Sequence, residues 1–440
     1  MKREIYLPYF ENKKVTVLGL GLLGRGVGDT KFLAEQHADI IVTDKKTKEQ
    51  LISSLEILKD FPITYRLGEH VKEDFEHRDF ILQAAGVASD NEYIQHARKQ
   101  GIEVHMSASL VSDIVMKNLE GVTIIGVTGT RGKSTTTQLI AHILRSANSR
   151  VHLGGNIRGV ANLPLLDEIE DGDYLVLELD SWQLQGFGEA RISPHIAVFT
   201  SFLDDHMNYY ANDKDAYFND KANIYRSQHE GDVLIASAQA AGEILMREKK
   251  LAILVPEKRQ FEMKLIGEHN QVAAGLAYEA ALQCGLDEET ILSAIASFIA
   301  VDGRLEDLGT FKSMRVFNDN NATTPDAVIA GIKAIYETYG IKPILIMGGA
   351  DKGLPLDTLE KTVQDETKIC ILLSGSGTDK LSLEKTYVCD HLSECVDKAF
   401  SLAEAGNIIL FSPGFASFGH EFNNEYERND AFVEAVRKYS

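Results

Sequence analysis

Two glycine-rich turns constrain the fold of this chain more than any other feature, because each joins an apolar, strand-like run to a helical pattern. The first, GLGLLG at residues 19–24, follows VTVL, and the second, GTRGKS at residues 129–134, follows VTIIGVT. A third and less regular segment, PILIMGGADKG at residues 343–353, has the same order of features. Strand, glycine turn and helix in succession are typical of parallel sheets with helical crossovers. We therefore predict an α/β protein.

The length of the chain predicts more than one domain. Its 440 residues exceed what one hydrophobic core supports. No linker rich in proline or serine marks the boundaries, so we place them by the motifs. We expect a Rossmann-like domain at residues 1–118, a central phosphate-loop domain at 119–300, and a second Rossmann-like domain at 301–440.

Composition excludes several classes of function. The formal net charge is −20, without a basic cluster to offset it, which argues against nucleic-acid binding and binding to anionic membranes. The four cysteines lack C-x-x-C spacing, so neither a zinc site nor a disulfide framework is indicated. The N-terminal segment MKREIYLPYF has no apolar core of signal-peptide length, and no apolar run in the chain approaches the length of a membrane span. We expect a cytoplasmic monomer that holds any phosphate at a local site.

The first glycine turn has the pattern of a dinucleotide-binding turn. Gly19, Gly21 and Gly24 form G-x-G-x-x-G after a strand, and Asp44 ends the next strand-like run. Such glycines let backbone amides approach a pyrophosphate, while the acid reaches a sugar or base. Taken alone, the pattern suggests a dehydrogenase, or a tight turn without a ligand.

The second turn indicates a nucleotide triphosphate. The segment 129–134 lies between a hydrophobic strand and an amphipathic helix, as a phosphate-cradling loop requires. Lys133 is expected at the β- and γ-phosphates, and Ser134 at Mg²⁺. The strict pattern has glycine where this chain has Val127, so only the shorter G-T-x-G-K-S form is present.

Several polar residues downstream are candidate metal ligands. Glu178 ends the apolar run YLVLE, Asp204, Asp205 and His206 follow another strand-like run, and Lys221 comes fifteen residues after His206. A lone histidine in this position is more often structural. Together with Glu178 and the phosphate loop, His206 becomes a candidate for the metal site.

These motifs, with others, carry a resemblance to a known family. The segments GVTGTRGKSTTT, GGNI, LELDSWQL, DDHMNYY, KANIY, GEHN, GRLE, NDNNATTPD and SPGFASFG follow one another in the order and spacing of the Mur ligases. These are ATP-dependent amino-acid ligases of peptidoglycan precursor synthesis. The first domain with GLGLLG most resembles that of the members that add glutamate to UDP-N-acetylmuramoyl-L-alanine.

The resemblance implies roles for particular residues. It implies that ATP is bound by Gly129, Thr130, Arg131, Gly132, Lys133, Ser134, Thr135, Asn270, Arg304 and Asp319. It implies that the UDP-linked substrate and the amino acid are bound by Gly21, Leu22, Leu23, Asp44, Asn156, Asp180, Asn321, Thr323, Ser417 and Phe418. It implies two Mg²⁺ ions held by Ser134, Glu178, His206 and Lys221, with Lys221 carbamylated. The catalytic residues are then Lys133, His206 and Lys221.

Two departures from the family pattern lie in the segments expected to bind the amino acid. Asn321 stands where the family has lysine in Asp-Ser-Lys-Ala-Thr, and Gly419 stands where it has aspartate after Ser417 and Phe418. Exchanging lysine for asparagine removes a charge that would attract the glutamate carboxylates. We expect D-glutamate as the acceptor, with L-glutamate as the alternative. A folylpolyglutamate-type ligase and an NAD-dependent oxidoreductase are two further candidates.

Overall fold

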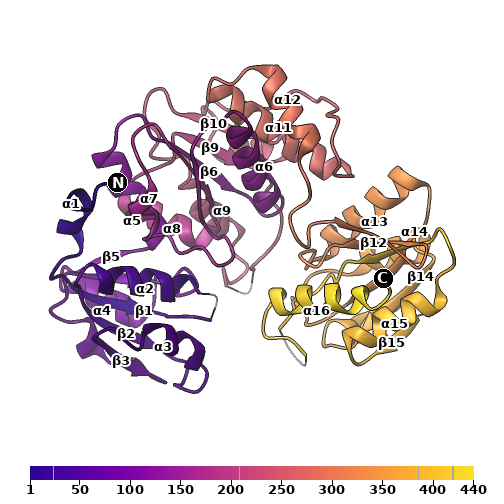
Figure 1. Ribbon diagram of the computed structural model, residues 1–440, viewed down its shortest axis with the longest axis horizontal. Coiled ribbons are helices and arrows are strands. Elements are labelled where there is room, and N and C mark those ends of the chain that lie inside the picture. The colour runs from indigo at the N-terminus through magenta and orange to yellow at the C-terminus, as the bar shows by residue number, and fades with distance from the viewer. Residues whose placement is uncertain (23, 208, 385, 419–420) are drawn as a thin grey trace. The chain divides into compact units, whose positions relative to one another are not determined.

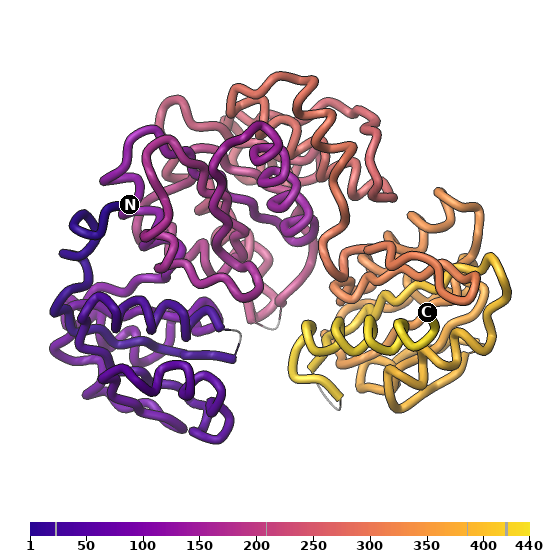
Figure 2. The backbone as a smooth tube through the Cα atoms, viewed as in Figure 1, coloured from indigo at the N-terminus to yellow at the C-terminus, as the bar shows by residue number. Residues whose placement is uncertain are grey.

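The computed structural model describes residues 1–22, 24–207, 209–384, 386–418 and 421–440. The chain folds into two compact units, each held together by contacts among its own residues. The first contains residues 1–258 and 275–291, and the second contains residues 259–274 and 292–440. Figure 1 shows three sheets, each with helices packed beside it, and Figure 2 traces the same path. The predicted α/β class with parallel sheets is confirmed, while the domain boundaries at 118 and 300 stay a prediction.

The first sheet has five strands in the order 3-2-1-4-5 of a Rossmann fold, with all neighbours parallel. Its order is β3 (Ile63–Leu67), β2 (Asp39–Asp44), β1 (Lys14–Leu18), β4 (Phe80–Gln83) and β5 (Glu103–His105). The helices of this region are α1 (Arg3–Tyr6), η1 (Leu7–Tyr9), α2 (Arg25–Glu35), α3 (Ile52–Leu58), η2 (Lys72–Phe75), α4 (Glu92–Lys99) and α5 (Ser107–Asn118). The first glycine turn joins the middle strand β1 to α2, at the point where the strand order reverses.

The second sheet is also parallel throughout. Its order is β10 (Val233–Ala236), β9 (Ile196–Phe199), β6 (Thr123–Thr128), β8 (Tyr174–Glu178) and β7 (Val151–Gly155). The helices that follow along the chain are α6 (Lys133–Ser146), α7 (Leu165–Glu168), α8 (Ser181–Ala190), α9 (Lys214–Ala222), α10 (Ala238–Arg247), α11 (Glu268–Gln283) and α12 (Glu288–Ser297). Helices α11 and α12 contribute residues to both units. The second glycine turn joins the middle strand β6 to α6.

The third sheet belongs to the second unit and is parallel except for β11, which pairs antiparallel with β12. Its order is β11 (Glu306–Phe311), β12 (Met314–Asn318), β16 (Ile408–Phe411), β13 (Ile344–Gly348), β14 (Ile369–Leu373) and β15 (Thr386–Cys389). The helices are α13 (Pro325–Tyr339), α14 (Asp357–Glu366), η3 (Thr378–Lys380), α15 (Leu392–Leu402) and α16 (Glu425–Arg437).

The apolar strand residues explain why these sheets form. In the third sheet, alternate residues of one strand enter two different buried clusters. Ile344 and Ile346 of β13 pack with α15 and α16, and Leu345 and Met347 pack with α13 and α14. A parallel sheet covered by helices on both faces requires strands that are apolar on both sides. Polar residues are therefore confined mainly to the loops at the strand ends, and ligands of such sheets bind at the carboxyl ends of the strands.

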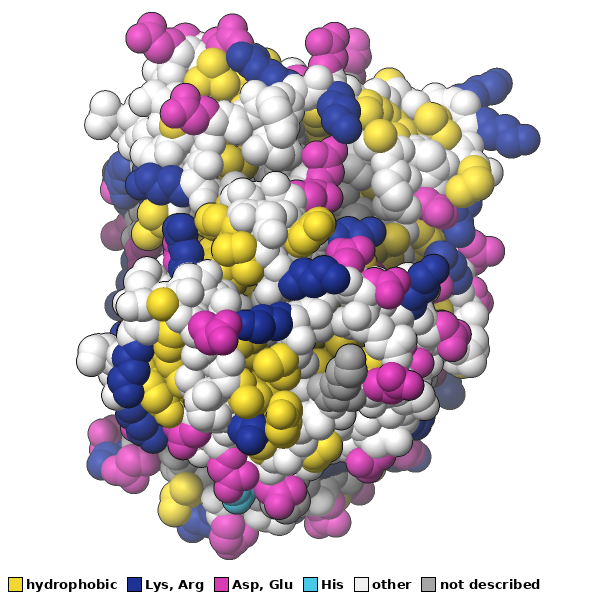
Figure 3. Space-filling model, turned by 90° about the vertical axis from the view of Figure 1, so that its right-hand side faces the viewer, with side chains coloured by type: hydrophobic (Ala, Val, Ile, Leu, Met, Phe, Trp, Pro, Cys, Tyr) yellow, Lys and Arg dark blue, Asp and Glu magenta, His cyan; other side chains and the backbone are white. Residues whose placement is uncertain are grey.

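The surface carries charges of both signs. On the face drawn in Figure 3, Lys and Arg side chains are interspersed with Asp and Glu side chains, and apolar side chains lie between them. Nowhere in the described part of the chain is a helix long and apolar enough to cross a membrane.

Candidate active site

The phosphate loop has the backbone geometry that its glycines allow. Gly129 has a φ of 145°, and Gly132 caps α6 with a φ of 83°. A Cβ added at Gly129 would lie 2.0 Å from Thr200 Oγ1 and 2.8 Å from Ser201 N. Lys133, Ser134 and Thr135 form the first turn of α6, where amide groups and the helix dipole favour an anion.

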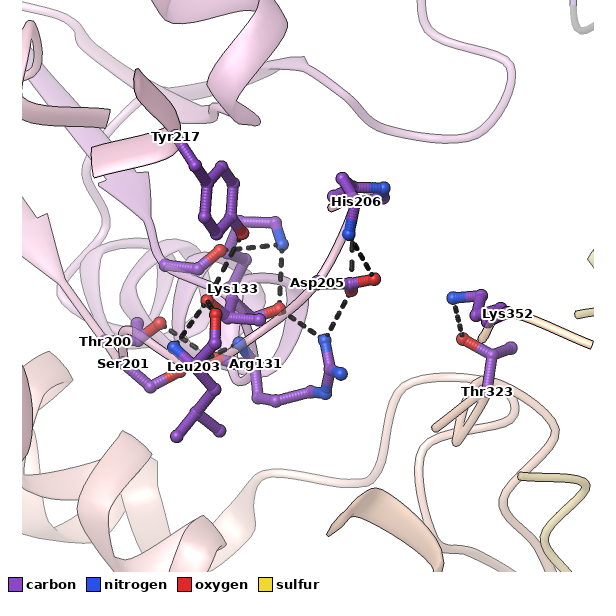
Figure 4. Close-up of polar contacts among 12 residues, drawn as sticks. Arg131, Lys133, Thr200, Ser201, Leu203, Asp205, His206, Tyr217, Thr323 and Lys352 are labelled. Atoms are coloured by element: carbon purple, nitrogen blue, oxygen red, sulfur yellow. Dashed lines mark hydrogen bonds and ion pairs between the residues drawn. The ribbon is translucent and has the colours of Figure 1, made fainter. Parts of the chain in front are cut away.

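The segment after β9 holds this loop in shape. Thr130 N donates to Ser201 O at 2.7 Å, and Arg131 N donates to Ser201 Oγ at 2.8 Å. Leu203 N in turn donates to Thr130 Oγ1 at 2.9 Å. Figure 4 shows Thr200, Ser201 and Leu203 gathered beside Arg131 and Lys133. Hydrogen bonds within the protein thus hold the loop in this shape, and such preorganisation lowers the entropic cost of binding.

Two lysines meet at one carbonyl oxygen of the loop. Lys133 Nζ donates to Gly129 O at 3.0 Å, and Lys221 Nζ donates to the same oxygen at 2.9 Å. Lys221 is 1 % exposed, and its Nζ lies 4.9 Å from the centre of the Tyr217 ring. Burial, and then the nearby Lys133, hold the pKa of the Lys221 amine well below its ordinary value.

Glu178 and Asn156 lie on the strands beside the loop. Glu178, the last residue of β8, is buried and pairs with Val127 of β6, two residues before the loop begins. Asn156 follows β7, and its N–H donates to Glu178 O at 2.7 Å. Asp180 caps α8 by accepting from Gln183 N at 2.8 Å. The fold thus places three predicted site residues at the end of the sheet where the phosphate loop lies: Glu178, Asn156 and Asp180.

His206 lies in a cluster of aromatic and charged side chains. Asp205 Oδ2 accepts from Arg131 Nη1 at 2.8 Å and lies 3.7 Å from His206 Nε2. The His206 ring centre is 4.8 Å from that of Trp182, the single tryptophan of the chain. Figure 4 shows Asp205 between Arg131 and His206. Asp205 thus links the phosphate loop to the predicted metal ligand His206.

The first glycine turn lies close to the predicted acid. Gly21 N donates to Asp44 Oδ2 at 3.1 Å, and Lys46 N donates to Asp44 Oδ1 at 2.8 Å. Leu22 is half exposed beside them, with 52 % of its surface accessible. Leu23, also predicted to bind the substrate, lies outside the described residues.

In the second unit, Asp319 is fixed by two donors. Leu305 N donates to Asp319 Oδ1 and Ser412 Oγ donates to Oδ2, each at 3.0 Å. Burial raises the pKa of Asp319 to about 7, against the opposing effects of these donors and of Arg304. Asn270, another predicted nucleotide contact, is buried and donates to Ile266 O at 2.8 Å. The second unit thus contains Asn270, Arg304 and Asp319.

The loops predicted to bind the amino acid follow strands of the third sheet. Thr323 Oγ1 accepts from Lys352 Nζ at 3.1 Å, a contact drawn in Figure 4. Asn321 Nδ2 donates to Asp302 O at 3.2 Å. Ser417 is buried and Phe418 is 61 % exposed. Sequence reasoning missed Lys352, although the lysine in GGADKG directly after β13 was a usable signal. Lys352 brings a cation to the segment in which the family pattern has lysine at 321.

The donor atoms beside the phosphate loop suit a hard cation. Ser134 and Glu178 supply oxygen atoms there, and oxygen is the donor that Mg²⁺ prefers. Within the described residues, no three His, Cys, Asp or Glu side chains form a metal-binding group by themselves.

Comparison with known proteins identifies the family. Residues 127–254 match the Mur ligase middle domain, and residues 13–106 match the N-terminal domain of MurD-like Mur ligases. A protein of Roseiflexus sp. RS-1, named UDP-N-acetylmuramoylalanine-D-glutamate ligase, is 32 % identical over 97 % of this chain and 99 % of its own. The chain belongs to the Mur ligase family. A protein of the same name from Borreliella afzelii is also 32 % identical to this Mur ligase, over 98 % of the chain and 99 % of its own.

Solved structures agree with the fold of this Mur ligase. MurC of Thermotoga maritima superposes with a TM-score of 0.63 at 18 % identity, covering 97 % of this chain and 100 % of that one. MurF of Thermotoga maritima, solved in complex with ADP, has a TM-score of 0.63 at 16 % identity and covers 100 % and 99 %. The predicted three-domain Mur ligase architecture is confirmed.

Proposed function

We propose that this protein uses ATP to join glutamate to UDP-N-acetylmuramoyl-L-alanine. The observation that carries the proposal is the convergence of Lys133 and Lys221 on Gly129 O, at the edge of the sheet that also presents Glu178 and Asn156. The two relatives named as D-glutamate ligases support D-glutamate as the acceptor. L-Glutamate is the alternative.

The proposed reaction passes through an acyl phosphate. A carboxylate oxygen of the alanyl group attacks the γ-phosphorus of ATP, and ADP leaves. The amine of glutamate then attacks the acyl carbon, loses a proton, and expels phosphate that carries the attacking carboxylate oxygen. The first step brings negative groups together, so it needs cations that are already in place. Lys133 and the amino end of α6 supply positive potential there.

Magnesium fits the donors at this edge of the sheet. We propose that Ser134 and Glu178 hold one Mg²⁺, and that His206 and Lys221 hold a second. Bound Mg²⁺ neutralises phosphate charge. The buried carboxylate of Glu178 at the end of β8 supports the first assignment.

We propose that Lys221 carries a carbamate. Its lowered pKa favours the neutral amine, which adds to carbon dioxide and releases a proton. The product offers oxygen atoms instead of an ammonium group beside Lys133. A carbamate attracts the Lys133 ammonium group, which would repel a protonated Lys221, in a place where Lys221 is shielded from water.

The glutamate pocket is proposed to use Lys352 as its cation. Thr323 orients the Lys352 ammonium, which pairs with a glutamate carboxylate, and Asn321, Ser417 and Phe418 complete the pocket wall. The binding of UDP by Gly21, Leu22 and Asp44, and of the nucleotide by Asn270, Arg304 and Asp319, remains part of this proposal.

A product assay tests the proposed function. The enzyme is incubated with UDP-N-acetylmuramoyl-L-alanine, ATP, Mg²⁺ and bicarbonate, and with each glutamate enantiomer separately. Phosphate release and a product heavier by one glutamyl residue are expected with D-glutamate. Lys133→Ala should be inactive, whereas Lys117→Ala, at an exposed lysine on α5, should keep full activity. No product with either enantiomer would refute the proposed function.

A further inference from the structure

One face of α2 is fixed against the segment that follows β7. Asp29, which is 4 % exposed, accepts from Leu163 N at 2.8 Å. A Cβ added at Gly28 would lie 2.5 Å from the Cβ of Ala161. The helix that follows the first glycine turn therefore packs directly on residues 156–163, without room for a side chain at Gly28.

Arg25 extends this contact to Asn156. It is the first residue of α2, directly after Gly24, and lies one helical turn before Asp29 on the same face. Its guanidinium donates to Asn156 Oδ1. Since Asn156 N also donates to Glu178 O, Arg25 joins the first glycine turn to the edge of the second sheet.

The contact determines which end of the Asn156 amide is available to a ligand. A guanidinium has only donors, so it selects the amide oxygen Oδ1. The other end, Nδ2, carries two donors, and no acceptor for them is found among the described residues. Phosphate and carboxylate oxygens are acceptors only, so they need Nδ2 and are repelled by Oδ1.

We infer that Arg25 is a positioning residue for the UDP-linked substrate. By holding Oδ1, it presents Asn156 Nδ2 to an anionic oxygen of that substrate, either a diphosphate oxygen or the carboxylate that reacts. This inference rests on the proposed function and adds to it a residue that none of the sequence motifs contains. Without Arg25, no other described residue fixes the Asn156 side chain by its Oδ1, and the hydrogen bond from Nδ2 to the charged oxygen is weakened or lost.

Steady-state kinetics with three variants tests the inference. Arg25→Met keeps the aliphatic stem but removes the donors, Arg25→Lys keeps a cation, and Lys31→Met removes an exposed charge from the same helix as a control. A lost hydrogen bond to a charged group predicts a fall in kcat/KM for the UDP-linked substrate of about tenfold to a hundredfold in Arg25→Met. The KM values for ATP and glutamate should stay within about twofold, Arg25→Lys should recover part of the loss, and Lys31→Met should match wild type.

A double-mutant comparison separates positioning from a general structural effect. If Arg25 acts through Asn156, Arg25→Met adds little in an Asn156→Ala background. Equal losses in both backgrounds, or full activity of Arg25→Met, would overturn the inference. If Arg25→Met does not fold, Arg25→Lys carries the same comparison. An inactive wild type would instead remove the proposed function, and an active wild type with an unaffected Arg25→Met would remove only this inference.

Discussion

Replacing Asp319 by asparagine should change how the stability of the protein depends on pH. The Asp319 carboxyl is almost fully buried, and its pKa is raised from 3.8 to about 7. Asparagine has the same shape and no charge. Its Oδ1 can keep the hydrogen bond from Leu305 N, and the Ser412 hydroxyl can rotate to accept from its Nδ2. The substitution therefore removes the titration while preserving the contacts.

The magnitude follows from the two pKa values. The folded state binds the proton more tightly than the unfolded state, so the contribution to stability is fully present below about pH 4 and is lost as the pH rises through about 7. The whole difference corresponds to about 4 kcal/mol of unfolding free energy. Between pH 5 and pH 8, wild type should lose about 2.5 kcal/mol relative to Asp319→Asn.

Urea unfolding followed by circular dichroism at several pH values measures this difference. Asp357→Asn, at an exposed aspartate in the first turn of α14, serves as the control and should follow wild type. Comparison of wild type with Asp319→Asn cancels the other titrating groups. A constant difference between the two proteins from pH 5 to pH 8 would show that Asp319 titrates as an ordinary carboxyl, against our reasoning.

Three further predictions concern other sites. The indole Nε1 of Trp182 is buried without a hydrogen-bond partner among the described residues. Trp182→Phe removes this buried donor and should raise the unfolding free energy by about 1 kcal/mol. An unchanged or lower thermal midpoint would count against this prediction. Gly28→Ala should destabilise the protein by about 1 to 3 kcal/mol, since the added methyl meets Ala161, while Gly86→Ala, in open space, should be neutral in the same thermal unfolding assay. Removing carbon dioxide should reduce activity, and bicarbonate labelled with a heavy carbon isotope should restore it and give a carbamate signal in the carbon nuclear magnetic resonance spectrum of the folded enzyme; full activity without carbon dioxide would contradict the carbamate.

The parallel sheets and the phosphate loop were predictable because their signals are local. One supersecondary unit contains the apolar run before Gly129, the glycines of the loop and the helical pattern after Lys133. Each of these patterns predicts the conformation of its own segment. The same holds for Pro325, which begins α13 as its preference for the first helical position predicts.

The contacts that complete the site were harder to predict, because they join residues far apart in the chain. Arg25 and Asn156 are 131 positions apart, and Lys221 and Gly129 are 92 apart. Such pairs depend on how helices pack on sheets, which single-sequence patterns do not contain. The sequence around Asn321 showed no cation for the expected pocket. In the folded protein, Lys352 from the loop after β13 reaches Thr323 after β12, although β16 lies between these two strands.

The fate of one oxygen atom tests the central claim of an acyl phosphate most directly. UDP-N-acetylmuramoyl-L-alanine is prepared with a heavy oxygen isotope in its terminal carboxylate and is converted to product with ATP and D-glutamate. If the carboxylate attacks the γ-phosphorus of ATP, the released phosphate carries one heavy oxygen, which mass spectrometry detects. Unlabelled phosphate accompanying full product formation would contradict the account.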